Sequence, residues 1–195
     1  CEERIRERVA PQMAFVDAIR AALPEDGVYV NELTQIGYVS TYGFPVQAPH
    51  SYVWPGYQGT LGYAMPTALG AAVGAGGRPV VAVTGDGGIG WSLQELATAK
   101  RYGIPLVTVL FEDGRFGNVW RIQRDTYGGR FIGSDLVNPD FALLAQAFGI
   151  DFVDVEDADG VRTAIEAAIA ARRPAIVRVR VDVFPSPWSL IHEKH

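Results

Sequence analysis

The stretch "VTGDGGIGWSLQEL", residues 83–96, decides the fold. A run of strand-forming residues leads into a glycine-rich turn, and a helical pattern leaves it. This order is the build of a phosphate-binding loop, in which backbone N–H groups at a helix N-terminus face an anion. Asp86 nevertheless places a carboxylate inside the loop. Two like charges about 4 Å apart repel by about 1 kcal/mol in water and by several times more when partly buried, so a phosphate here needs a counter-charge.

Apolar runs and helical repeats alternate on both sides of this loop. Strands are predicted at 27–32, 78–85, 104–113, 150–155 and 174–183. Helices are predicted at 11–24, 61–75, 91–103, 139–149 and 158–173. Continuous apolar strands separated by helices are typical of a parallel sheet that is covered on both faces. We therefore expect a doubly wound α/β fold with a mainly parallel sheet.

Ligands of such sheets bind at the carboxyl ends of the strands, where the strand order reverses. Three predicted strand ends carry polar or glycine residues, at 31–35, 85–88 and 112–117. The segment 40–59 has too many Pro, Gly and aromatic residues for a regular element, and a loop of that length is usually functional or disordered.

Composition and charge argue against several classes of function. The net charge is −5 and Lys and Arg do not cluster, so neither nucleic acid nor an anionic membrane is expected as the main partner. No apolar run reaches the roughly 18 residues that span a bilayer. One cysteine leaves no intrachain disulfide framework, and we expect a cytoplasmic protein.

The length of 195 residues favours a single domain. The chain does not begin with Met, so we expect a piece of a longer protein. Residues 1–10 are predicted to be a linker or a remnant, residues 11–183 the folded domain, and residues 184–195 a C-terminal tail.

Two kinds of site fit the glycine-rich loop. Gly85, Gly87 and Gly90 satisfy the G-x-G-x-x-G pattern of a dinucleotide site, but Asp86 would repel a pyrophosphate bound without metal. A divalent cation between carboxylate and phosphate turns the repulsion into attraction, and Mg²⁺ is usually held by one or two carboxylates plus ligand phosphates. Asp113 supplies a second carboxylate at the next predicted strand end, 27 residues after Asp86.

This arrangement resembles the thiamine diphosphate-dependent enzymes, whose motif is Gly-Asp-Gly followed about 27 residues later by a second metal ligand. "GDGG" (85–88) and "FEDGRFGN" (111–118) resemble its two ends. The resemblance implies Asp86, Asp113 and the Arg115 carbonyl as metal ligands. It also implies that the N–H groups of Gly87, Gly88 and Phe116 lie near the diphosphate, with Gly85 and Gly117 as further cofactor-binding residues. Glu112 departs from the family's usual Asn, which changes the local charge balance.

Upstream segments extend the resemblance. "GTLGYAMPTALGA" (59–71) is similar to the stretch in which a bulky residue, here Leu61, wedges between the two cofactor rings. The Gly59 carbonyl would accept a hydrogen bond from the aminopyrimidine. "NELTQ" (31–35) resembles benzoylformate decarboxylase-like members and implies Thr34 and Gln35 near the diphosphate. "GNVWRIQ" and "DLVNPDFALLAQAFGI" resemble the acetolactate synthase branch, with Ile122 where that branch has Trp.

The resemblance implies the C-terminal diphosphate-binding domain of a thiamine diphosphate- and Mg²⁺-dependent transferase or lyase. Its substrate would be a 2-keto acid, in acetolactate synthase-like carboligation or in decarboxylation. The activating glutamate belongs to a separate pyrimidine-binding domain, so no catalytic residue is expected in this chain, and neither Glu32 nor Glu95 replaces it. A homodimer or homotetramer is expected. The alternative is a non-catalytic Rossmann-like nucleotide-binding or regulatory module, which would bind its ligand without magnesium.

Overall fold

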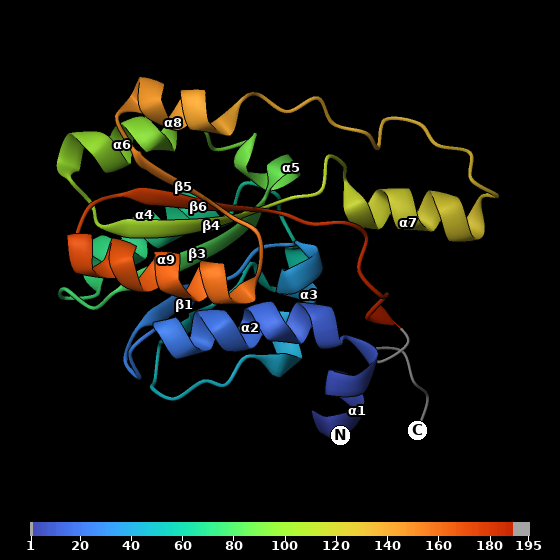
Figure 1. The fold of residues 1–195 in the computed structure, drawn as a ribbon, viewed down its shortest axis with the longest axis horizontal. Helices are drawn as coiled ribbons and strands as arrows, with labels where there is room; N and C mark the ends of the chain where they lie inside the picture. The colour runs from blue at the N-terminus through green and yellow to red at the C-terminus, as the bar shows by residue number, and fades with distance from the viewer. Residues whose placement is uncertain (1, 189–195) are drawn as a thin grey trace.

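The computed structural model describes residues 2–188 and contains a six-stranded parallel sheet with helices on both faces (Figure 1). The strand order is β2-β1-β3-β4-β6-β5, and all five pairings are parallel. The strands are β1 (Val28–Val30), β2 (Tyr52–Val53), β3 (Val80–Gly85), β4 (Leu106–Glu112), β5 (Asp151–Val155) and β6 (Ala175–Arg180). The predicted doubly wound α/β fold is therefore confirmed.

Side chains on the central strands alternate between two apolar cores. On β3, Val81 and Val83 join the core on one face, while Val80 and Ala82 join the core on the other. All four are buried, which explains why the strand appears in the sequence as an unbroken apolar run.

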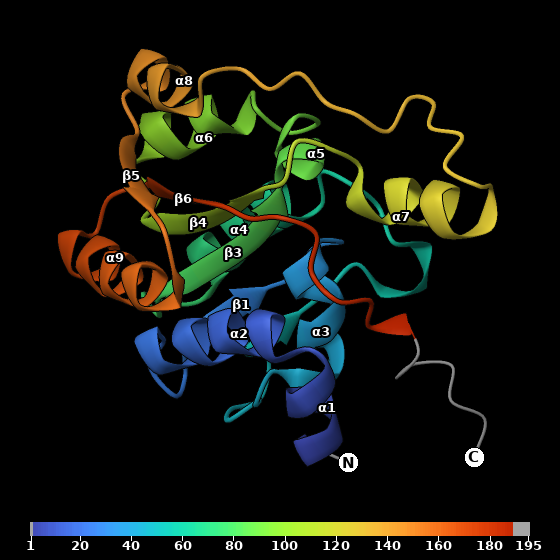
Figure 2. The same cartoon turned by 45° about the vertical axis from the view of Figure 1, so that its right-hand side comes forward.

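Each face of the sheet has its own set of helices (Figure 2). The first face is covered by α2 (Ala10–Ala22), α3 (Gln35–Gly43) and α9 (Ala158–Ala171). The second face is covered by α4 (Ala64–Gly74), α5 (Asp86–Ile89), α6 (Glu95–Tyr102) and α8 (Phe141–Phe148). Helix α7 (Gly117–Thr126) extends away from the sheet, and a long irregular segment returns from it to α8 (Figure 1).

The predicted helix 91–103 is shorter in the structure and begins only at Glu95. Residues 90–94 form turns between α5 and α6, closed by tighter hydrogen bonds such as Trp91 N–H to the Gly88 carbonyl and Ser92 N–H to the Ile89 carbonyl. These hydrogen bonds join residues three apart, as in a 3₁₀-helix. The apolar residues of such a segment recur with nearly the same spacing as in an α-helix, so the sequence pattern alone does not distinguish the two.

The predicted loop 40–59 is also partly regular. Helix α3 runs to Gly43, and β2 adds an edge strand that pairs Tyr52 with Tyr29. The helix begins where the Thr34 hydroxyl accepts a hydrogen bond from the Gly37 N–H, which is a typical N-cap. The ring of Tyr29 stacks on both Phe44 and Tyr52, with centroid distances of 4.2 and 5.6 Å, and these two rings also contact each other. These ring contacts hold a segment whose composition suggested no regular structure.

Residues on both sides of the predicted 11–183 domain pack onto it. Helix α1 (Glu2–Arg8) precedes Val9, which is fully buried in the first core, and Phe184 packs against the same core. The predicted boundaries remain predictions, and residues 189–195 of the predicted tail lie outside the described residues. In the described part of the chain, no helix is long and apolar enough to cross a membrane.

Candidate functional site

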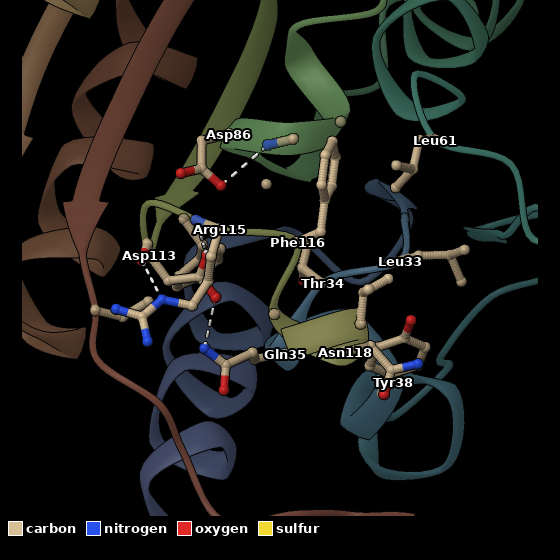
Figure 3. A pocket seen from close by; sticks show the side chains of 17 residues that line it. Leu33, Thr34, Gln35, Tyr38, Leu61, Asp86, Asp113, Arg115, Phe116 and Asn118 are labelled. Carbon is tan, nitrogen blue, oxygen red and sulfur yellow. Dashed lines mark hydrogen bonds between the residues drawn. The ribbon is translucent and has the colours of Figure 1, made fainter. Parts of the chain in front are cut away.

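A cavity of about 200 Å³ lies at the carboxyl ends of β1, β3 and β4 (Figure 3). The chain turns outward in opposite directions from β1 and β3, so this is the switch point of the sheet, where ligands of such folds bind. Eleven of the twelve predicted site residues line it; the exception is Gly59. The eleven are Thr34, Gln35, Leu61, Gly85, Asp86, Gly87, Gly88, Asp113, Arg115, Phe116 and Gly117.

Six further residues line the cavity without having been predicted: Leu33, Tyr38, Phe111, Asn118, Val119 and Val181. Tyr38 and Val119 belong to α3 and α7, two helices that were not predicted. Recognition of Thr34 as a helix N-cap would have placed Tyr38 one turn further along the same helix. Val181 comes from the end of β6 and has no comparable local signal.

Three helices begin at the wall of this cavity. Helix α3 starts at Gln35, α5 at Asp86 and α7 at Gly117, and all three residues line the cavity. The first-turn N–H groups of a helix have no acceptor within the helix, and its dipole places partial positive charge at that end. The backbone therefore favours an anion in this cavity.

Asp86 lies within this anion-binding backbone and is itself buried. Its Oδ1 accepts from the Gly87 N–H at 3.0 Å, and its Oδ2 accepts from the Gly114 N–H at 2.8 Å and the Asn138 amide at 2.7 Å. Burial raises the pKa of Asp86, and these three donors oppose the shift by stabilising the ionised form. The carboxylate is thus held in one orientation.

Asp113 lies close enough to Asp86 for the two charges to interact. Burial, together with the charge of Asp86, raises the pKa of Asp113 to about 6. The Arg115 N–H donates to Asp113 Oδ1 at 3.2 Å, and the Gln35 amide donates to Oδ2 at 2.9 Å. Two neighbouring carboxylates in a partly buried site repel each other, and a bound cation would remove the repulsion.

We expect the contribution of Asp113 to the free energy of unfolding of the metal-free chain to fall as pH rises from about 4 to about 6. The pKa of Asp113 is about 6 in the fold and about 4 in an unfolded chain. The folded state therefore binds more protons in this window, and stability is lost as the carboxyl group ionises. Urea unfolding in EDTA, with Asp113→Asn as the comparison, measures the effect. A slope that Asp113→Asn leaves unchanged would contradict this assignment.

The side-chain amide of Gln35 forms hydrogen bonds with other groups of the protein. Besides Asp113, its Nε2 donates to the Asp182 carbonyl at 3.1 Å. Its Oε1 accepts from the Phe184 N–H at 2.8 Å and from the Arg121 guanidinium at 3.2 Å. The resemblance implied Gln35 near the diphosphate, and the residue does line the cavity. Its amide, however, orients Asp113 and ties it to the C-terminal segment.

The C-terminal segment, residues 181–188, runs between α3 and α7 in both views (Figures 1 and 2). The Trp188 indole N–H donates to Asn118 Oδ1 at 2.9 Å, and the ring packs on Tyr38 at 4.9 Å. Asn118 and Tyr38 both line the cavity. The described part of the predicted tail is therefore docked beside the site.

Phe116 contributes its ring to the cavity wall, where a Cβ on Gly87 would stand 2.7 Å from it. The resemblance implied that the Phe116 N–H lies near the diphosphate. In the structure this N–H donates instead to the Ser134 carbonyl at 2.7 Å. The first-turn amides of α7, which begins one residue later at Gly117, remain to face an anion.

Glu112 is balanced by a network that the sequence did not reveal. Its Oε1 accepts from the Asn138 amide at 3.1 Å, and this same amide donates to Asp86. Its Oε2 lies 3.4 Å from Arg178, which is itself paired with Asp154 at 2.5 Å. The extra negative charge at position 112 is thus compensated by arginine side chains of the neighbouring strand β6.

The oxygen ligands available here suit magnesium. Among the described side chains, no group of three or more His, Cys, Asp and Glu residues could hold a metal by itself. Asp86 and Asp113 form a pair of carboxylates within an anion-binding backbone. Such a pair fits a cation whose remaining ligands include the phosphates of a bound cofactor.

Comparison with known proteins agrees with this geometry. Residues 34–179 match the family described as "Thiamine pyrophosphate enzyme, C-terminal TPP binding domain". The chain is 36% identical over 174 residues to a probable 2-ketoarginine decarboxylase of Pseudomonas aeruginosa, covering 88% of this chain and 31% of that protein. It is 31% identical over 169 residues to the large subunit of acetolactate synthase isozyme 2 of Escherichia coli, covering 86% of this chain and 31% of that subunit.

A solved structure gives the same result. The thiamine diphosphate-dependent 4-hydroxybenzoylformate decarboxylase of Rhodococcus jostii RHA1 superposes with a TM-score of 0.81 at 28% identity, covering 92% of this chain and 34% of that one. The fold and site therefore define an α/β cofactor-binding domain. The chain belongs to the thiamine pyrophosphate-dependent enzymes and corresponds to their C-terminal cofactor-binding domain. It spans about a third of the length of these relatives.

Proposed function

We propose that this chain binds the diphosphate of thiamine diphosphate through a Mg²⁺ ion held by Asp86 and Asp113, with the Arg115 carbonyl as a third ligand. The observation that carries the proposal is a pair of carboxylates placed where three helix N-termini converge. The helices attract the phosphates and the cation joins them to the carboxylates, so each charge in the site has a partner.

The chain's own residues anchor and shape the cofactor. Bound thiamine diphosphate would supply the nucleophilic carbon and the electron sink for reactions of 2-keto acids. Leu61 stands across the cavity from the two carboxylates, on the side suited to the rings (Figure 3). Gln35 and Asn138 hold the carboxylates in position by hydrogen bonds from their side-chain amides.

In the complete enzyme the proposed activity is decarboxylation or acetolactate synthase-like carboligation of a 2-keto acid. The names of the similar proteins support this class, because they include a 2-ketoarginine decarboxylase, an acetolactate synthase and a 4-hydroxybenzoylformate decarboxylase. The activating glutamate would come from the pyrimidine-binding domain, as the resemblance implies, and no catalytic residue is assigned within this chain.

Exposed apolar side chains support docking of that domain or of a second copy of the chain. Tyr57 is fully exposed, and Trp54 and Trp91 are also exposed. Trp91 lies against Gly62, in the same turn as Leu61. Large exposed apolar side chains beside a site favour an interface there. A homodimer or homotetramer with these residues near the seam is the proposed assembly.

Titration calorimetry tests the cofactor proposal on the chain as it stands. Thiamine diphosphate should bind in the presence of Mg²⁺ and give no detectable heat in EDTA, because Asp86 and Asp113 then repel the phosphates. NADH, the ligand expected of a dinucleotide module, should not bind in either buffer. Binding of NADH without metal, or equal binding of thiamine diphosphate after chelation, would favour the alternative nucleotide-binding module.

A further inference from the structure

Glu32 is a buried carboxylate for which the proposed cofactor binding gives no role. It follows β1 and is 1% exposed. Its Oε1 accepts from the backbone N–H groups of Gly62 and Tyr63, the second at 3.1 Å. Its Oε2 accepts from the Thr84 hydroxyl at 2.5 Å. A single side chain thus joins the end of β1, the turn before α4 and the end of β3.

The N-terminus of α4 has no cap of its own. Tyr63 occupies the N-cap position and makes no side-chain capping bond. Glu32 supplies an acceptor from a distant part of the chain, because it accepts from the N–H groups of the two residues that directly precede the helix. A carboxylate at this end of a helix is also favoured by the helix dipole.

The turn that Glu32 holds is the one that carries Leu61 into the cavity. Gly62 has a φ of +77°, in the left-handed region, and a Cβ there would stand 2.7 Å from the Cβ of Trp91. The turn therefore requires glycine at position 62, and Glu32 holds the turn by hydrogen bonds immediately after Leu61. The position of the Leu61 side chain depends on this hydrogen-bonded pair of amides.

The same carboxylate also contacts the diphosphate side of the cavity. A Cβ on Gly88 would stand 2.8 Å from the carboxyl group of Glu32, and Gly88 is a wall residue in α5. Glu32 therefore lies in contact with both α5 and the Leu61 turn. Its geometry sets the spacing between the two sides of the cavity.

We propose that Glu32 is a positioning residue whose buried carboxylate fixes the Gly59–Tyr63 turn, so that Leu61 is held at a set distance from the diphosphate end of the site. The hydrogen-bonding role stands on this structure alone, while the consequence for thiamine rests on the proposed function. The proposed role requires the length of the Glu32 side chain and its two acceptor oxygens.

Two substitutions of Glu32 test the length of its side chain and its charge separately. Glu32→Asp keeps the charge but withdraws the carboxylate by one methylene, so it can no longer bond both the turn and Thr84. Glu32→Gln keeps the reach: its carbonyl oxygen can accept from Gly62 and Tyr63, and its NH₂ can donate to the Thr84 hydroxyl oxygen. Glu95→Gln, in the first turn of α6, is the matched control.

Hydrogen exchange of the Gly62 and Tyr63 amides gives a readout that needs no ligand. Exchange should be faster by about tenfold in Glu32→Asp and close to wild type in Glu32→Gln and in the control. Equal protection in Glu32→Asp and wild type, or equal loss in Glu32→Asp and Glu32→Gln, overturns the proposal. If Glu32→Asp does not fold, Thr84→Val decides: faster exchange at Gly62 and Tyr63 supports the proposal, and unchanged exchange overturns it.

Ligand binding then tests the consequence. With Mg²⁺ present, Glu32→Asp should weaken the binding of thiamine diphosphate. Binding of inorganic diphosphate should stay within about twofold of wild type, because the substitution removes no hydrogen bond to the phosphates. Equal weakening of both ligands would overturn the positioning of Leu61. If the wild-type chain binds neither ligand, the proposed function fails, and the exchange measurements still decide the role of Glu32.

Discussion

Asp86→Ala should weaken Mg²⁺-dependent binding of thiamine diphosphate by at least about a hundredfold. Removing a residue that only hydrogen-bonds to a metal ligand already lowers metal affinity by about 10- to 100-fold, and Asp86 is proposed as a ligand itself. The substitution removes one of two carboxylates from a site that needs oxygen ligands in octahedral geometry. It also leaves the Gly114 N–H and the Asn138 amide without the acceptor that orients them. Calorimetry with and without Mg²⁺ measures the effect, and Asp159→Ala on the exposed side of α9 is the control.

Two substitutions of the second carboxylate, Asp113, should weaken thiamine diphosphate binding to different degrees. Asp113→Ala should match Asp86→Ala, whereas Asp113→Asn should be milder because the amide retains an oxygen that can bind the metal. Thermal unfolding of each variant shows whether the fold survives. Binding by Asp86→Ala within about tenfold of wild type would rule out the metal bridge between Asp86 and the diphosphate.

Arg178→Met should lower the free energy of unfolding by about 2–3 kcal/mol, because removing one partner of a buried ion pair leaves the other charge uncompensated. The Arg178 side chain is 7% exposed and Glu112 is 16% exposed, so water can replace the lost cation only poorly at Glu112. Asp154 is 49% exposed and recovers its hydration. The expected loss therefore comes mainly from Glu112. Urea unfolding measures it.

Two further variants make the prediction specific to charge. Arg180 also lies 3.5 Å from Glu112 but is 68% exposed, so Arg180→Met should cost less than about 1 kcal/mol. Glu112→Asn introduces the residue usual in the family and should recover part of the stability lost in Arg178→Met. Additive effects in the double variant would mean that Arg178 stabilises the fold by packing rather than by compensating Glu112.

Much of the fold followed from local patterns, whereas most of the predicted cavity residues came from the resemblance to thiamine diphosphate-dependent enzymes. The apolar runs predicted five of the six strands, and the parallel arrangement followed because helices separate them. Since the carboxyl ends of neighbouring parallel strands lie together, Asp86 and Asp113 could be assigned to one place from their spacing alone. The missed elements include α1, β2, α3 and α7; the helices α3 and α7 contain glycine or irregular polar residues and are stabilised by packing against other segments.

The sequence by itself therefore determined five of the six strands, their parallel arrangement and the strand ends that carry the two carboxylates. Only the tertiary structure decided what each polar group bonds to. Gln35 orients Asp113, and the Phe116 N–H donates to the Ser134 carbonyl. Glu32 accepts from the amides directly before α4, a helix that begins 32 residues further along the chain. The physical reason is range: periodicity and capping act over one or two turns, whereas a side-chain hydrogen bond depends on which distant segments the fold brings within about 3 Å.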